Sequence, residues 1–244
     1  MWDFVFGHSL MAMLIGGSLG AILWFFLMRR RLKTGFIGVL VITALCMVWG
    51  VFWLKMFAIL EARIASVVNG RTYEPGNMSL FGAVFFDPVL FYSIAKAKKI
   101  EFRKAFDIFS IGLAIALILG RMNCFFAGCC VSGSFDYPLI GTVIWPVREI
   151  EVLYYIGFIA LLAPMIVHNR TNGEVYPLFM ASYGALRFVL EWTRDLYFPV
   201  GSLHLSHIWA LISFVVGLVL YKRVTTNGVS TAVGRVGKTG GTTR

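Results

Sequence analysis

Long apolar runs recur along the whole chain, and this feature constrains the fold more than any other. The runs are long enough to form helices that cross the hydrocarbon core of a bilayer, and charged clusters separate them. Only 14% of the 244 residues are charged and the mean hydropathy is +0.80, too apolar for the surface of a soluble domain of this length. The pattern excludes a cytosolic enzyme and a disordered chain, and it predicts an all-α, polytopic membrane protein.

Seven segments are candidate membrane spans. The third is short and contains Asp87 and Pro88, so it is predicted to be either a plain span or a broken, re-entrant one. We expect one membrane domain over residues 1–223 and a flexible cytoplasmic tail over residues 224–244, which are rich in Gly, Thr and Val. The seven segments are Val5–Met28, Phe36–Leu60, Leu80–Ala95, Ala105–Ala127, Glu149–Val167, Tyr176–Trp192 and His207–Tyr221.

The basic residues predict the orientation of these spans. Most Lys and Arg residues follow the first, third, fifth and seventh spans, and few lie in the other loops. Because cytoplasmic loops carry an excess of basic residues, we expect the amino terminus outside and the carboxyl terminus inside. The net charge of +10 is then explained by topology and by contact with anionic lipid headgroups, and no nucleic-acid partner is expected.

Ionisable side chains inside a bilayer are costly, and they mark candidate functional sites. On the sixth span, Tyr183, Arg187, Glu191 and Arg194 are spaced by four, four and three residues, which places them on one stripe of a helix. One interpretation is an Arg187–Glu191 pair that only neutralises buried charge. The other is a binding site that uses these groups.

Three arginines, Arg121, Arg148 and Arg187, lie near the outer ends of their predicted spans. Guanidinium groups bind phosphate through paired N–H donors, most strongly where water is scarce. Glu151 lies three residues after Arg148 and adds a carboxylate that can orient the site or move a proton. This set of groups favours phosphoryl-ester chemistry on a phospholipid head, whereas an anion-transport site would explain the carboxylates less well.

A cysteine cluster follows the fourth span. Cys124 lies three residues after Arg121, whose charge favours a thiolate, and Cys129 and Cys130 follow in a predicted outer loop. Structural thiols, a disulfide from Cys124 to Cys129 or Cys130, and a direct chemical role all stay open. A zinc site is not expected, because no histidine lies in this segment and the fourth cysteine, Cys46, is distant in the sequence. No metal or cofactor is predicted.

Ordered motifs between residues 75 and 207 resemble the prolipoprotein diacylglyceryl transferase family of bacterial inner-membrane enzymes. Residues 76–82 are similar to the family's Gly-Gly-Met-Ser-Phe-His-Gly run, and Gly120-Arg121 matches the opening of its Gly-Arg-x-Gly-Asn-Phe-x-Asn-Gly-Glu signature. Pro146 and Glu151 match its His-Pro-Ser-Gln-Leu-Tyr-Glu segment. The sixth span matches its Tyr-Gly-x-x-Arg-Phe-x-x-Glu-x-x-Arg segment at Tyr183, Gly184, Arg187, Phe188, Glu191 and Arg194.

The resemblance implies transfer of a diacylglyceryl group from phosphatidylglycerol, or another anionic phospholipid, to a cysteine of a prolipoprotein signal peptide or a related acceptor. It implies that Arg121 and Arg187 bind phosphate, that Tyr183 lies beside the reacting centre, and that Glu151 orients the site. It also implies a multi-pass protein of the bacterial cytoplasmic membrane with its active site toward the outer leaflet, and we expect a monomer. Substrate-binding roles are expected for Arg148, Glu191, Arg194, Asn123, Cys129 and Cys130.

The chain departs from the family's motifs at several polar positions. The family's His, a proposed base, aligns with Phe81, and its Gln near the start of the last helix aligns with His207. Its signature Asn residues align with Cys124 and Ala127, and its signature Glu aligns with Cys129. The phospholipid donor is therefore expected to be kept while the acceptor stays open. The general base is unassigned, with His207 as the first candidate, and Cys124 is a candidate for a covalent step.

Two functions of other classes stay open. One is a membrane thiol–disulfide protein built on the cysteine cluster, which would need the cysteines and not the arginines. The other is a lipid-binding or flippase-like relative that keeps the headgroup site and has lost catalysis, in accord with Phe81. That relative would bind phosphatidylglycerol without turnover.

Overall fold

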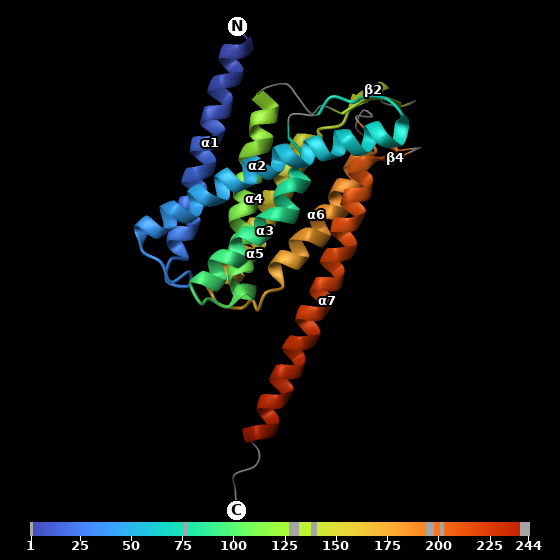
Figure 1. Ribbon diagram of the computed structural model, residues 1–244. Helices are drawn as coiled ribbons and strands as arrows, with labels where there is room; N and C mark the ends of the chain where they lie inside the picture. Colours follow the sequence, from blue (N-terminus) through green and yellow to red (C-terminus); the bar gives the residue numbers. More distant parts are fainter. Residues whose placement is uncertain are drawn as a thin grey trace, which may run out of the picture.

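The computed structural model describes residues 2–75, 78–126, 132–137, 141–193, 198–200 and 203–239. Within these residues the chain forms seven helices, which confirms the predicted number, and four short strands (Figure 1). The helices are α1 (Trp2–Leu27), α2 (Phe36–Asn69), α3 (Leu80–Ala97), α4 (Phe102–Phe126), α5 (Val147–Val167), α6 (Val175–Glu191) and α7 (Leu205–Thr239). The strands are not predicted from the sequence. They form two antiparallel hairpins, β1 (Ser134–Tyr137) with β2 (Gly141–Ile144) and β3 (Pro199–Val200) with β4 (Leu203–His204).

The apolar runs account for the helices, because a backbone inside lipid must satisfy its polar groups within its own segment. In the described part of the chain, five helices are long and apolar enough to cross a membrane, namely α2, α3, α4, α5 and α7. Helix α6 has only 17 residues and is buried along most of its length. The architecture is that of a multi-pass membrane protein.

Three helices differ from their predicted spans. Helix α2 ends at Asn69 rather than near Leu60, so part of the predicted outer loop is helical. Helix α3 is continuous through Pro88, so the alternative of a broken span is wrong. Helix α7 continues to Thr239, into the residues predicted to form a tail, and the domain boundary there stays a prediction.

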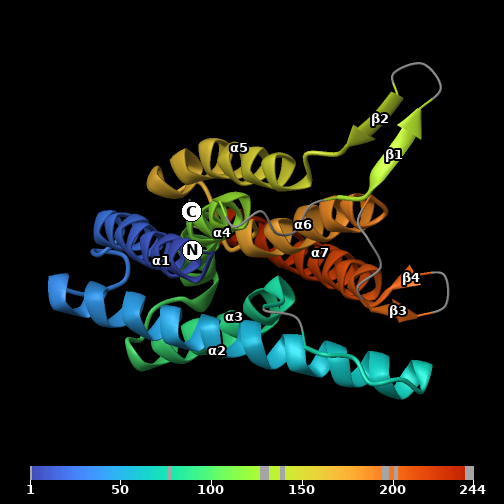
Figure 2. The same cartoon turned by 90° about the horizontal axis from the view of Figure 1, so that it is seen from above.

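Helix α4 lies at the centre of the bundle, in contact with α1, α3, α5 and α6 (Figure 2). Helix α2 crosses the bundle obliquely, so that its second half reaches the end of the molecule that carries the strands (Figure 1). There Ala62 and Ala65 of α2 pack against Phe198 and Leu205, which flank the second hairpin. This crossing brings the second half of α2 to the same end of the bundle as the start of α7.

The basic loops meet at the opposite end of the bundle. Lys33, after α1, donates a hydrogen bond to the carbonyl of Lys99, after α3, at 2.8 Å. Arg31 donates to the carbonyls of Ile166 and Val167 at the end of α5, the latter at 2.8 Å. The loops predicted to share one side of the membrane therefore lie together, and which side they face stays a prediction.

Asp107 of α4 fixes the position of α6 along the axis of the bundle. Its carboxylate accepts hydrogen bonds from the backbone N–H groups of Gly173 at 2.8 Å and Val175 at 2.9 Å. These N–H groups lie at the start of α6, where a helix has no internal acceptors for its first donors. A side chain of α4 thus caps α6, and this contact fixes the axial position of the polar stripe of α6 relative to α4.

Helices α6 and α7 approach each other until their backbones nearly touch. A Cβ atom at Gly184 of α6 would lie 2.6 Å from the carbonyl oxygen of Ala210 and 2.6 Å from the backbone nitrogen of Phe214. Ser213 of α7 donates a hydrogen bond to the carbonyl of Met180 at 2.9 Å. Small residues that allow close approach are a common basis of helix association in membranes.

The Gly184→Ala variant is expected to destabilise the protein by about 1–3 kcal/mol, because the added methyl group has to push two backbones apart. Thermal unfolding in detergent measures this loss. Gly157→Ala is the matched control, since a Cβ atom at Gly157 of α5 would meet nothing within 4 Å. Equal midpoints for the two variants would contradict the proposed importance of the α6–α7 contact.

Candidate active site

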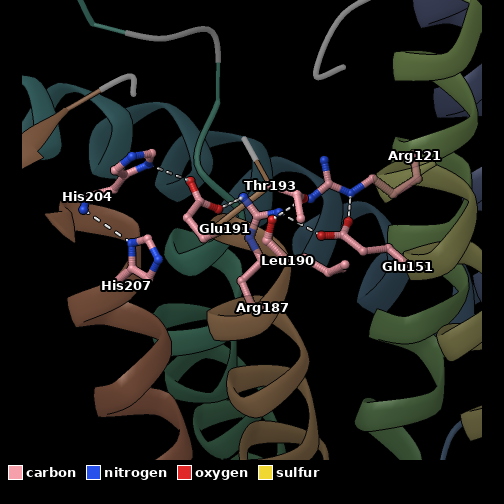
Figure 3. A network of polar contacts seen from close by, with 8 residues as sticks. All are labelled: Arg121, Glu151, Arg187, Leu190, Glu191, Thr193, His204 and His207. Atoms are coloured by element: carbon pink, nitrogen blue, oxygen red, sulfur yellow. Dashed lines mark hydrogen bonds and ion pairs between the residues drawn. The ribbon is translucent and has the colours of Figure 1, made fainter. Parts of the chain in front are cut away.

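Glu151 joins three helices at the end of the bundle that carries the strands. This residue of α5 is fully buried, with 0% of its surface exposed. Its carboxylate forms an ion pair with Nε of Arg121 on α4 and accepts a hydrogen bond from Nη1 of Arg187 on α6 at 2.7 Å (Figure 3). The two guanidinium groups that the sequence analysis singled out therefore share one carboxylate.

The network continues from Arg187 to α7. Nη2 of Arg187 lies 3.0 Å from Oε2 of Glu191, one turn further along α6. Oε1 of Glu191 lies 3.6 Å from Nδ1 of His204, and the backbone N–H of His204 donates to Nδ1 of His207 at 3.2 Å. Figure 3 shows these side chains as one chain of polar contacts from α4 to α7.

The charges of this network balance. Arg121 and Arg187 supply two positive charges, Glu151 and Glu191 supply two negative charges, and all four side chains are buried. A buried ion must be paired, so the carboxylates make it possible to hold two guanidinium groups away from water. Each guanidinium has five N–H donors, and the ion pair of Arg121 uses the one on Nε. Its four terminal donors form no ion pair with Glu151 in the described part of the chain, and we expect them to face a phosphate.

Two tyrosines form a wall beside the arginines. The rings of Tyr155 and Tyr183 are stacked with centroids 6.3 Å apart, and neither residue is exposed. Both interact electrostatically with Arg121. Their buried hydroxyl groups have no hydrogen-bond partner among the described residues. Buried polar groups are nearly always paired in folded proteins, so two such hydroxyls beside two guanidiniums indicate a site for a polar ligand.

Phe81, at the position of the family's His, belongs to this wall. Its ring lies 6.0 Å from that of Tyr183 and it is 2% exposed. Position 81 therefore faces the same region as the arginine network, but a phenyl ring cannot accept a proton. By the resemblance, the family's His would lie in this region, where this chain has a phenyl ring.

Glu61 of α2 is a site residue that the sequence analysis missed. It is 5% exposed, its carboxylate is hydrogen-bonded by the side chain of Ser79, and it interacts electrostatically with Arg187 and Glu191. The span predicted from the sequence ends at Leu60, which places Glu61 in an outer loop. The available signal was the helical spacing of the buried residues Phe57, Ala58, Glu61, Ala62 and Ala65.

Arg148 lies apart from this network in its described contacts. Its Nη1 donates to the carbonyl of Cys124 at 3.1 Å, and its guanidinium lies 5.3 Å from the ring centroid of Phe125. These contacts fasten the start of α5 to the end of α4. Cys124 lies one turn after Arg121 and interacts with it electrostatically.

Four further predictions fall outside what the structure describes. Arg194, Cys129 and Cys130 lie outside the described residues, and the side chain of Asn123 lies outside them as well. Their expected roles in substrate binding, and the possible disulfide, stay predictions.

Comparisons with known proteins agree with the motifs. A family model described as prolipoprotein diacylglyceryl transferase matches residues 12–223. A phosphatidylglycerol–prolipoprotein diacylglyceryl transferase of Finegoldia magna is 25% identical over 150 residues, which cover 59% of this chain and 60% of that protein. Proteins of the same name from Clostridioides difficile and Bordetella avium are 22% identical over 153 residues and 27% identical over 161 residues. The matched regions cover 61% and 60% of this chain and 62% and 60% of those relatives, so this chain spans less than two thirds of their length.

Proposed function

This chain belongs to the prolipoprotein diacylglyceryl transferase family, and we propose that it transfers a diacylglyceryl group from phosphatidylglycerol to a cysteine thiol of a prolipoprotein. The observation that carries this proposal is the shared carboxylate of Glu151, which holds Arg121 and Arg187 together beside two buried tyrosine hydroxyls. A redox protein built on cysteines would have no use for two buried guanidinium groups. A lipid phosphate would pair with them.

The proposed reaction needs stabilisation of a leaving group. The acceptor sulfur attacks the glyceryl carbon, a thioether bond forms, and the C–O bond to phosphate breaks with its electron pair on oxygen. The phosphate monoester that leaves carries more negative charge than the phosphodiester that entered. Arginine donors aimed at that oxygen stabilise the transition state more than the ground state, which is how such groups increase rates.

Each network residue has a role in this proposal. Arg121 and Arg187 bind the phosphate, and Glu151 and Glu191 hold their guanidinium groups in place. Tyr183 donates its hydroxyl hydrogen to a lipid oxygen near the reacting carbon. Arg148, with its contact to the end of α4, positions the loop that follows.

We also propose where the protein works. With the basic loops gathered at one end of the bundle and the arginine network at the other, the positive-inside rule puts the network near the outer leaflet of the bacterial cytoplasmic membrane. The amino terminus is then outside and the carboxyl terminus inside. The described network residues all belong to one chain, and we propose that the protein acts as a monomer.

Mass spectrometry tests the proposed function directly. Purified protein in phosphatidylglycerol vesicles is incubated with a lipobox peptide, and we expect the peptide to gain one diacylglyceryl group. A diacylglyceryl group on Cys124, Cys129 or Cys130 with an unmodified peptide would instead indicate a covalent intermediate and another acceptor. If neither the peptide nor the protein is modified, the transferase proposal is wrong.

A further inference from the structure

The acceptor thiol must lose a proton. Neither Phe81 nor His207, the two positions that the sequence suggests for a base, can take it. Phe81 is apolar. His207 accepts the backbone N–H of His204 at Nδ1, so in the neutral ring the hydrogen lies on Nε2. His207 therefore presents a donor and not a proton acceptor. Its Nε2 is buried without a hydrogen-bond partner among the described residues, in accord with donation to a substrate.

We infer that Glu61 is the general base of this protein, a role that rests on the proposed transferase function. Its side chain is buried, and it interacts with Ser79, the residue before α3, and electrostatically with Arg187 and Glu191 in the second half of α6. Ser79 holds the carboxylate, and Oε1 has no hydrogen-bond partner in the described part of the chain. Ser79 lies two residues before Phe81, whose ring packs on Tyr183. Glu61 thus brings a carboxylate from α2 to the region in which the motif lacks its imidazole.

Two other carboxylates near the site, those of Glu151 and Glu191, are already paired with basic groups. Both oxygens of Glu151 contact guanidinium groups, and Glu191 contacts Arg187 and His204. A proton on either residue would break a buried ion pair. Asp87 faces Gly50 of α2, which precedes Glu61 by about 16 Å along the helix. Unlike Glu151 and Glu191, Glu61 forms no ion pair within the described residues, so it can take a proton without loss of one.

The step is balanced in protons and electrons. Oε1 of Glu61 takes the proton of the acceptor thiol as the sulfur forms its bond to the glyceryl carbon. The electron pair of the breaking C–O bond goes to the phosphate oxygen between Arg121 and Arg187. The proton then leaves Glu61 for the departing phosphate monoester or for water, and the carboxylate is restored.

The test compares Glu61→Gln with wild type in the peptide assay. Glutamine keeps the shape and can still bond Ser79, but it cannot take a proton, so we expect the rate to fall about a hundredfold or more near neutral pH. Glu101→Gln is the matched control, because Glu101 is exposed at the opposite end and pairs only with Lys104 among the described residues. It should retain the wild-type rate.

Two readouts separate a base from a structural residue. The thiolate fraction of a peptide cysteine rises about fiftyfold between pH 6.5 and 8.5, so the defect of Glu61→Gln should shrink as the pH rises. The charged groups that interact with Glu61 are Arg187 and Glu191, and both are present in the variant. A selenocysteine peptide, whose selenol is ionised at neutral pH, should react with the variant at close to the wild-type rate.

The outcomes are distinct. Recovery with selenocysteine and with rising pH supports Glu61 as the base, and it also proves that the variant is folded. A defect that neither condition relieves, or a fully active variant, overturns the inference and leaves the transferase function standing. If wild type and Glu101→Gln fail to modify the peptide, the proposed function is wrong and the inference falls with it.

Discussion

Replacement of Arg187 with alanine is expected to slow diacylglyceryl transfer by a hundredfold or more. The guanidinium of Arg187 contacts both Glu151 and Glu191. Its removal takes away one partner of the leaving phosphate, and it leaves two carboxylates with one guanidinium, so the net charge of the network changes from zero to minus one, which repels an anion. The initial rate of peptide modification in phosphatidylglycerol vesicles, taken as kcat/KM, measures the loss.

Two further variants make this result specific. Arg187→Lys keeps a positive charge and loses the planar fork, so its rate should lie between those of wild type and the alanine variant. Arg170→Ala removes an exposed arginine that follows α5 at the basic end of the bundle and should leave the rate unchanged. A rate for Arg187→Ala within tenfold of wild type would rule out phosphate binding by this residue.

Removal of Glu151 should have the largest effect on stability. The Glu151→Ala variant leaves Arg121 and Arg187 buried without their shared carboxylate, and loss of one member of a buried ion pair costs about 3–5 kcal/mol. Thermal unfolding in detergent should show a lower midpoint, and transfer activity should be lost. A midpoint equal to that of wild type would mean that the bundle does not depend on this carboxylate.

A variant without any of the four charges tests what the network is for. Arg121→Met, Glu151→Leu, Arg187→Met and Glu191→Leu together replace the ion pairs with apolar side chains of similar size. Such replacements are often neutral or stabilising, so this variant should regain the midpoint that Glu151→Ala loses. It should remain inactive. Activity in this variant would contradict the role of the network in the reaction.

The fold was largely predictable because the bilayer restricts the choices. Runs of about 20 apolar residues form helices in lipid, and each of the seven predicted segments corresponds to one helix of the structure. The end of α2 was misplaced because Glu61 and Arg63 were interpreted as the start of a loop. Their place in a helix depends on the crossing of α2 over the bundle, and no local pattern encodes that crossing.

The site was predictable only in part. The stripe of Tyr183, Arg187 and Glu191 follows from helical spacing, and the structure buries all three on α6. That one carboxylate serves two arginines on different helices depends on how α4, α5 and α6 pack, which the spacing within single helices does not reveal. Glu61 was not predicted for the same reason, since its neighbours at the site are Ser79, just before α3, and two residues of α6.

The aromatic wall has a consequence for a competing reaction. Phe81, Phe179, Tyr155 and Tyr183 are each at most 2% exposed, and the rings of Phe179 and Tyr183 lie parallel at 5.8 Å. Water is the commonest nucleophile at any membrane surface. Its attack on the same glyceryl carbon would hydrolyse the lipid and release free diacylglycerol. In the proposed reaction, a glyceryl carbon that lies against these four rings would be shielded from water. Fidelity in this protein, the choice of a thiol over hydrolysis, would then be a property of its rings and not of its charges.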